Sequence, residues 1–217
     1  MPGTLIRLWI VALIAQALCI GRCAFAAGPE STSSKRVEGM HIEEAGAYNA
    51  LGEISQKAHV VLGVDAVQPV KEPTIVLDFA GGTVAQLMDS FVSQAPDYRW
   101  EEIDGGIVHV SRDKAHVSLL DVLMAYPGAS KKTRREIWED IAKRPEVLSW
   151  MDANHCVRGE FFNGKEFREH NDPISIASAP MTVAQLLDAV AVKSGVDYWA
   201  VLQSPPSSPC RVDIMLW

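Results

Sequence analysis

The chain lacks the short motifs that many enzyme classes carry. It has no Gly-rich phosphate-binding loop and no Gly-x-Ser-x-Gly nucleophile elbow. Its six histidines form no His-x-x-x-His pair and its four cysteines no Cys-x-x-Cys pair, so closely spaced zinc ligands are absent. Carboxylates are plentiful but scattered, and no two of them stand out as general acid and base. We therefore predict no catalytic residue, no metal site and no cofactor, and expect that the protein is not an enzyme.

Positive charge is the scarcer charge in this chain. There are 20 Lys and Arg residues against 27 Asp and Glu residues, which gives a formal net charge of −7. General nucleic-acid binding needs basic clusters that neutralise phosphates, so we predict no nucleic-acid partner. Apolar residues make up 48% of the chain, which excludes a disordered protein and is ample for a packed core.

Long apolar runs are also few. The most prominent run covers residues 8–20, with Arg7 before it and an A-x-A sequence at residues 24–26 after it. This arrangement is typical of a secretory signal peptide over residues 1–26, with an uncleaved anchor as the alternative, and the run is too short to span a bilayer. Cleavage removes two arginines and no acidic residue, which changes the formal charge from −7 to −9. We expect a periplasmic or secreted mature chain without a transmembrane segment.

Two of the four cysteines, Cys156 and Cys210, remain after the predicted cleavage. Because an exported protein enters an oxidising compartment, we predict that they form a disulfide. A loop of this length would stabilise the fold by about 4 kcal/mol in the chain-entropy model. The alternatives are two unpaired, buried thiols, or a thiol-dependent enzyme in which Cys156 acts with His155 and His170.

The most informative pattern is a heptad that occurs twice. It reads TVAQLMD at residues 83–89 and TVAQLLD at residues 182–188, and each copy is followed by an Asp-Tyr pair and a tryptophan. Self-similarity of this kind indicates a structural unit that occurs twice. We predict an α+β fold of two tandem small units, each with two helices packed on short, mostly antiparallel strands. The units cover residues 36–113 and 114–217 and follow a flexible polar spacer at residues 27–35.

Hydrophobic periodicity predicts two helices in the first unit. One covers residues 45–58, and the other begins at Thr83, an N-cap whose capping box is completed by Gln86. Strands are predicted over residues 36–43, 60–66, 74–79, 98–103 and 107–110, of which the last two form a hairpin.

The second unit is predicted to repeat this order of elements. A helix covers residues 131–144, a further helical turn begins at Pro145, and another helix begins at Thr182 with Gln185 in a second capping box. Strands are predicted over residues 116–124, 156–162, 165–169, 174–177, 198–203 and 211–216. The Asn-Gly pair at residues 163–164 predicts a hairpin between the second and third of these strands.

Four aromatic residues of the predicted strands are candidates for a sugar-binding or peptide-binding groove. They are Tyr98, Trp100, Tyr198 and Trp199. Their rings combine a large apolar surface with one polar group, which suits such ligands. In a small unit a strand aromatic more often belongs to the core, so we expect a binding role only for those that face solvent.

A cluster of basic residues lies at the predicted start of the helix over residues 131–144. It consists of Lys131, Lys132, Arg134 and Arg135. The helix dipole favours acidic residues at this end, so the cluster is a candidate patch for anionic lipid or an acidic partner. The alternative is a solvated helix face whose charge is neutralised by the three acidic residues that follow in the helix.

Residues 37–112 resemble the short N-terminal (STN) domain shared by secretins and TonB-dependent receptors. The matching stretches are ALGEIS at 50–55, IVLDF at 75–79, TVAQLMD at 83–89, YRW at 98–100 and GIVHV at 106–110. The second unit is a weaker match, at residues 174–176, 182–188 and 198–199. The resemblance implies a small periplasmic α+β module that docks other envelope proteins and carries no catalytic residues. Since no secretin pore, plug or barrel sequence follows the two units, we expect a free-standing module.

The sequence therefore predicts an exported, non-enzymatic protein-interaction module of the bacterial envelope. Its partner would be an envelope protein of a secretion, transport or signalling system, docked by addition of a strand to an open sheet edge. The alternative is a periplasmic glycan-binding or peptide-binding protein that uses the four aromatic residues between the two units.

Overall fold

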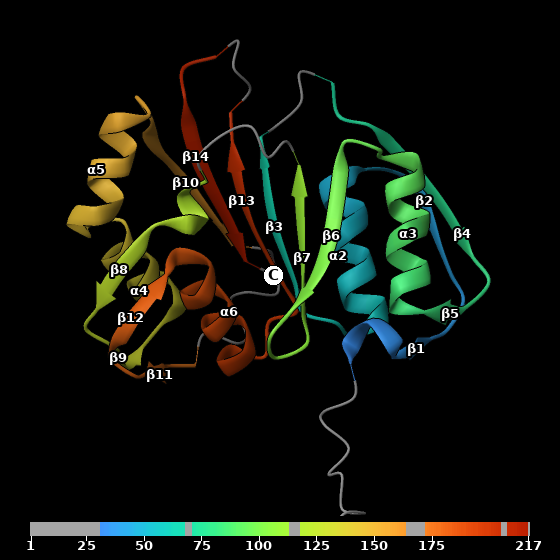
Figure 1. Ribbon diagram of the computed structural model, residues 1–217, viewed down its shortest axis with the longest axis horizontal. Helices are drawn as coiled ribbons and strands as arrows, with labels where there is room; N and C mark the ends of the chain where they lie inside the picture. The colour runs from blue at the N-terminus through green and yellow to red at the C-terminus, as the bar shows by residue number, and fades with distance from the viewer. Residues whose placement is uncertain (1–30, 68–70, 113–117, 164–171, 205–207, 217) are drawn as a thin grey trace, which may run out of the picture. The chain divides into compact units, whose positions relative to one another are not determined.

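The centre of the fold is a mixed sheet of six strands in the order β10-β14-β13-β3-β7-β6 (Figure 1). These strands are β3 (Leu62–Val67), β6 (Tyr98–Ile103), β7 (Ile107–Arg112), β10 (Val157–Asn163), β13 (Tyr198–Gln203) and β14 (Arg211–Leu216). Strand β13 pairs with β3 in parallel, from Tyr198 opposite Leu62 to Gln203 opposite Val67. Strands from both predicted units therefore lie in one continuous sheet.

The computed structural model describes residues 31–67, 71–112, 118–163, 172–204 and 208–216, and the helices and strands that it describes belong to one unit of the chain, Thr32–Trp217. The predicted signal peptide lies outside the described residues. The end of the predicted spacer forms a 3-10 turn, η1 (Thr32–Ser34). The backbone N–H groups of Thr32 and Ser33 donate to the carboxylate of Glu102 at 2.7 and 2.9 Å, which holds η1 against β6.

The two halves of the sheet pair their strands in the same pattern. In the first half β3 is parallel to β7 and β6 is antiparallel to β7. In the second half β10 is parallel to β14 and β13 is antiparallel to β14. The unit boundaries at residues 36–113 and 114–217 stay a prediction, because one sheet contains both halves.

Helices cover opposite faces of this sheet. They are α2 (Ala47–Ala58), α3 (Val84–Gln94), α4 (Arg134–Ile141), α5 (Pro145–Ala153) and α6 (Val183–Ser194). Strand β13 contributes to two cores: Tyr198, Ala200 and Leu202 pack in the core of α2 and α3, while Trp199 and Val201 pack in the core of α4, α5 and α6. Successive side chains of a strand point to opposite faces, so the two helix groups lie on opposite sides of β13. The mixture of helices with small antiparallel sheets confirms the predicted α+β class.

Short two-stranded sheets complete the fold. They pair β1 (Arg36–Val37) with β5 (Gly82–Thr83), β2 (Met40–Gly46) with β4 (Thr74–Phe79), β8 (Leu123–Tyr126) with β12 (Ala179–Thr182), and β9 (Ala129–Lys132) with β11 (Ile174–Ile176), all antiparallel. The apolar residues that recur at helical spacing in α2, α3 and α6 are buried, except that Val92 of α3 is only partly buried. Local periodicity therefore predicts these three helices and their packing faces correctly.

Two predicted elements of the second half differ in the structure, and a third is not covered by the described residues. The strand expected over residues 116–124 is wrong at 118–122, because the Oγ of Ser118 accepts from the N–H of Leu120 at 3.0 Å and opens a 3-10 turn, η2 (Leu119–Asp121). Its last two residues do begin a strand, β8, and residues 116–117 lie outside the described residues. The helix expected from residue 131 begins at Arg134, because Thr133 is its N-cap and the preceding residues form β9. The second arm of the hairpin expected at residues 163–164 lies outside the described residues, and β10 instead pairs with β14.

Candidate functional site

The two heptads hold the same contact between a helix and a hairpin. The indole Nε1 of Trp100 donates to Oδ1 of Asp89 at 2.8 Å, and that of Trp199 donates to Oδ1 of Asp188 at 2.9 Å. In both cases the acceptor lies eleven residues before the tryptophan. The last residue of each heptad therefore fixes the orientation of an indole ring on the following strand, a role that sequence reasoning missed. The constant Asp-to-Trp spacing in both copies is the signal that could have revealed it.

The first residues of the two heptads form matching capping boxes, as predicted. The N–H of Gln86 donates to Oγ1 of Thr83 at 3.2 Å, and the N–H of Thr83 donates to Oε1 of Gln86 at 2.9 Å. The distances at Thr182 and Gln185 are the same. Each heptad thus starts a helix at one end and orients a tryptophan at the other.

Strand β6 forms one edge of the six-stranded sheet. Within the described ranges no strand pairs with its outer side. Its exposed side chains include Arg99 and Glu101, and neither residue has an ion-pair partner in the part of the chain that the structure describes. Trp100 lies between them in sequence, points to the opposite face and is only partly buried. The edge therefore combines open main-chain groups, two unneutralised charges of opposite sign and one aromatic ring.

The four predicted aromatic residues do not come together in one groove. Tyr98 and Tyr198 lie buried in the core of α2 and α3, where the hydroxyl of Tyr198 donates to the carbonyl oxygen of Tyr48 at 3.3 Å. Burial raises the pKa of the Tyr98 hydroxyl, so it stays protonated. Trp199 is buried in the other core. Only Trp100 keeps part of its ring accessible.

The predicted basic cluster is dispersed by the structure. Arg134 is buried at the start of α4, and Nζ of Lys132 pairs with the carboxylate of Asp140. Arg135 pairs with Glu139 one helical turn further on, with 3.4 Å between Nε and Oε1. Only Lys131, which has a left-handed φ of 51°, stays exposed without an ion-pair partner among the described residues. Two of the four basic residues are therefore paired with acidic residues of α4, whereas Arg134 is not part of a solvated face.

A second polar cluster joins elements of both halves. Nε2 of His109, on β7, lies 3.0 Å from Oδ1 of Asp188, on α6, and the His109 ring meets the Trp199 ring edge-on at 5.3 Å. Asp188 is 7% exposed, so its carboxylate is held by two donors in a nearly dry environment. Beside it lies a pocket of about 270 Å³ whose polar lining includes Asp65, Glu101, His109, Ser111 and Asp121. A buried carboxylate beside an imidazole fixes the ring orientation.

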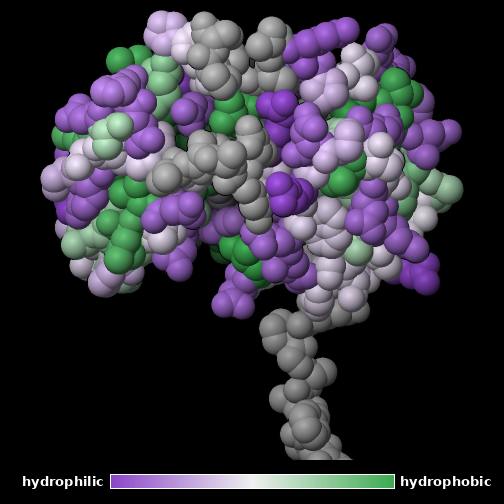
Figure 2. Space-filling view, turned by 45° about the horizontal axis from the view of Figure 1, so that its top comes forward, coloured by the Kyte–Doolittle hydropathy of each residue, from purple (hydrophilic) through white to green (hydrophobic). Residues whose placement is uncertain are grey.

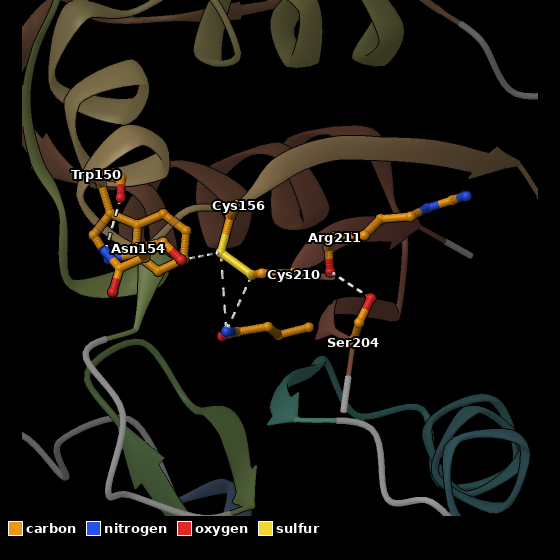
Figure 3. Close-up of a disulfide and its surroundings, with 7 residues drawn as sticks. Trp150, Asn154, Cys156, Ser204, Cys210 and Arg211 are labelled. Carbon is orange, nitrogen blue, oxygen red and sulfur yellow. Dashed lines mark hydrogen bonds between the residues drawn. A yellow bond between two sulfur atoms is a disulfide. The ribbon is translucent and has the colours of Figure 1, made fainter. Parts of the chain in front are cut away.

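Cys156 and Cys210 lie at disulfide distance, with 4.4 Å between their Cα atoms, as the sequence predicts (Figure 3). Cys156 follows α5 and Cys210 precedes β14, and the side-chain amide of Gln203 donates to the Sγ of Cys210 at 3.3 Å. A sulfur in a disulfide is no nucleophile, so the structure lends no support to the thiol-enzyme alternative. His155 is exposed, and His170 lies outside the described residues.

The surface is mostly polar in the space-filling view, where hydrophobic residues form small separate groups (Figure 2). The large apolar residues that are exposed come from different elements: Val76, Leu123, Leu148, Val157 and Val192. In the described ranges no cluster of His, Cys, Asp and Glu could hold a metal ion. None of the helices described there has the length and apolar character needed to cross a membrane.

No protein-family model matches this chain, and no curated protein matches it. The resemblance of residues 37–112 to the STN domain therefore stays a prediction.

Proposed function

We propose that this chain is an exported, non-enzymatic protein-interaction module that docks an envelope partner at the outer edge of β6. The observation that carries the proposal is the composition of that edge, where a strand whose outer side is unpaired among the described residues presents Arg99, Trp100 and Glu101. A partner segment that adds as a further strand gains main-chain hydrogen bonds from the edge and specificity from alternate side chains. The STN resemblance supports the same role, since that family docks envelope proteins.

Export is supported by the signal-peptide pattern and by the cysteine pair. Disulfides persist in oxidising compartments and are rare in the cytosol. Cys156 and Cys210, the two cysteines beyond the predicted cleavage site, lie at disulfide distance. A module that keeps its fold with this bond would be suited to the periplasm or the exterior.

Charged residues on an edge strand also limit unwanted pairing. Natural proteins place charges on exposed edges because a bare apolar edge accepts any strand. Arg99 and Glu101 oppose a strand that is apolar at the facing positions, since it would remove their charges from water without a counter-charge. The same two charges favour a strand that supplies counter-charges, so they act as a selective element of the docking edge.

Site-specific cross-linking in cells tests this proposal. A photo-cross-linking amino acid at Arg99 should capture an envelope protein reproducibly, whereas the same group at Val192, an exposed position of α6, should not. Equal capture at both positions, or capture at Val192 alone, would place the docking surface elsewhere.

Proline substitution on β6 supplies the second arm of the test. Neighbouring residues of a strand direct their N–H groups to opposite sides, so of Glu101→Pro and Glu102→Pro one breaks the ladder with β7 and the other removes an N–H from the outer edge. Because Glu102 also holds η1, Glu102→Ala is the control for loss of its carboxylate. The variant that keeps the wild-type melting temperature should lose capture of the partner. Full capture by that variant contradicts docking through the main chain of β6.

A small-ligand role is the second candidate, favoured by the pocket beside His109 and Trp199. This site uses only one of the four aromatic residues that the sequence suggested. A ligand that binds the folded state raises the melting temperature by mass action. A screen of envelope glycans and peptides should then give a hit whose shift is lost in His109→Ala, and a screen without any such hit removes this candidate.

A further inference from the structure

The joint between β13 and β3 shows how a strand docks beside a tryptophan of this kind. In the parallel pair, Trp199 stands opposite Gly63. The indole ring lies over that glycine, because a Cβ atom at residue 63 would come within 2.2 Å of Cζ2 of Trp199. Any larger residue at this position would collide with a ring held in place by Asp188. Strand β3 therefore accepts Trp199 only because it has no side chain there.

Trp100 repeats this geometry at the open edge. Its Nε1 donates to Asp89 as that of Trp199 donates to Asp188, with the same spacing along the chain. The same hydrogen bond between the same two elements gives both indoles the same placement on their strands. A strand that adds to β6 as β3 adds to β13 must then carry a glycine opposite Trp100.

The charges of β6 determine which partner residues fit on either side of that glycine. In the β13–β3 pair they are Leu62 and Val64, which face Tyr198 and Ala200 inside a core. On β6 the corresponding positions are Arg99 and Glu101, which are exposed and have no ion-pair partner within the described chain. Opposite charges on neighbouring strands stabilise a pair and like charges destabilise it. The facing residues should thus be acidic beside Arg99 and basic beside Glu101.

We propose that the partner segment that docks on β6 runs parallel to it and contains an acidic–Gly–basic triplet, with the glycine under Trp100. This inference rests on the proposed docking function and names the chemistry of the partner. The acidic residue precedes the glycine and faces Arg99, and the basic residue follows it and faces Glu101. The occupant is a segment of a different protein.

A second copy of this chain is the competing occupant, and a charge on its strand β10 disfavours pairing with β6. Strand β10 forms the other edge of the described sheet, and its Gly159 follows a helix as Gly63 does: His59 and His155 both have left-handed φ values, of 51° and 52°, four residues before the glycine. The residue before Gly159 is Arg158, however, which would face Arg99 of β6. Two like charges would then meet, so self-addition in this register is disfavoured.

Synthetic peptides based on β3 test the triplet. The parent sequence is residues 60–67, VVLGVDAV. One peptide carries Glu and Lys in place of Leu62 and Val64, a second carries Lys and Glu, and a third has the first pair of charges with Ala in place of the glycine. Binding to the full mature chain is followed by NMR shifts of β6 amides up to millimolar peptide.

The Glu-Gly-Lys peptide should bind about tenfold more tightly than the Lys-Gly-Glu peptide, because two facing pairs change from attraction to repulsion. The double variant Arg99→Glu/Glu101→Arg keeps the net charge and should invert this preference. The alanine peptide and the variant Trp100→Ala should each lose the tight binding. Equal binding of the two charged peptides, failure of the inversion, or no binding of any peptide would overturn the triplet.

Two further readouts separate this inference from the proposed function. Capture of a partner at Arg99 in cells, together with failure of the peptides, would reject the triplet and leave docking at β6 intact. Failure of both the capture in cells and the peptide binding would reject the docking proposal and the triplet together. A molar mass that rises with concentration for the chain alone, and falls to that of the monomer in Trp100→Ala, would assign the edge to a second copy and overturn the heterologous partner.

Discussion

The two hairpins of the central sheet, β6–β7 and β13–β14, each follow a copy of the heptad. The first strand of one lies at the edge of the sheet, and that of the other lies in its interior. Strand β13 is buried over its first five residues, because helices cover both of its faces and strands pair with both of its sides. Strand β6 buries only Tyr98 fully, because it lies at the edge and helices cover one face. The repeated local sequence therefore specifies a helix cap and an Asp–Trp hydrogen bond. The position of each copy in the sheet determines whether the other side chains of the strand are buried or exposed.

Truncation of the two tryptophans should separate the copies most strongly. Trp199→Ala is expected to cost about 3–5 kcal/mol of unfolding free energy, because it opens a cavity in a closed core. Trp100→Ala removes a partly exposed ring and is expected to cost about 1–2 kcal/mol. Urea unfolding of both variants measures the difference. Equal losses would mean that β6 is as enclosed as β13.

Loss of the disulfide should remove a constraint that the second hairpin has and the first lacks. The β6–β7 hairpin closes with a turn over residues 104–106, whereas β13 and β14 are joined by a longer connection that Cys210 ties to Cys156. The variant Cys156→Ser/Cys210→Ser is expected to lose about 2–4 kcal/mol. Denaturant titration checks this, with reduced wild type as the control, and a stability equal to that of the oxidised protein would show that the bond carries no constraint.

The two Asp–Trp hydrogen bonds should differ in energy although their lengths agree. Asp188→Ala leaves both the indole N–H of Trp199 and the His109 ring without their buried acceptor, and is expected to cost about 2–3 kcal/mol. Asp89→Ala acts at a solvent-accessible pair and is expected to cost less than about 1 kcal/mol. Thermal unfolding at one pH compares the two variants. A larger loss of stability for Asp89→Ala would contradict the conclusion that the Asp89–Trp100 pair is the more exposed one.

The capping boxes should show no difference between the copies. Thr83→Ala and Thr182→Ala each remove the same acceptor from boxes with the same distances. Each is expected to lose about 1 kcal/mol, because N-cap contributions are set within one helical turn. Paired unfolding curves of the two variants are the measurement. A clear difference between the two losses of stability would mean that contacts with the rest of the fold also stabilise one of the caps.

The third capping box, at Thr133 and Glu136, should add a small dependence on pH that the other two lack. The backbone N–H of Thr133, and then its hydroxyl, hold the pKa of Glu136 below its usual value of 4.5. A carboxyl whose pKa is lower in the folded state contributes stability above its unfolded pKa, and this is lost as the pH falls through the folded pKa. Unfolding between pH 6 and pH 3 should show a shallower decline for Glu136→Gln, whose amide can still complete the box, than for wild type.

Features set within a few residues could be predicted from the sequence. The caps at Thr83 and Thr182, the apolar helix stripes and the β6–β7 hairpin depend on neighbouring positions, and the structure confirms them. The proximity of Cys156 to Cys210 followed from their being the two cysteines beyond the predicted signal peptide.

Contacts between distant segments could not be predicted in this way. Nothing in the alternation of residues 60–66 indicates that β3 would pair with β13, because a fully buried strand accepts apolar neighbours from any part of the chain. Burial of Arg134 was missed for the same reason, since a basic residue near a helix start is usually solvated. The candidate edge was expected as a class, but its place on β6 required the strand order.

The parallel joint in the middle of the sheet also sets an order of events when the chain is made. Leu62 and Tyr198, which open that joint, are separated by 136 positions, so β3 is synthesised long before its partner strand exists. At a translation rate of about 5–20 residues per second, the inner side of β3 waits for roughly 7–27 seconds. During that interval the nascent first half has two unpaired strand sides, on β3 and on β6. The β6 strand carries Arg99, Glu101 and Glu102, whereas β3 carries Asp65 as its one charged residue. The open side of β3 therefore needs more protection from aggregation than the open side of β6.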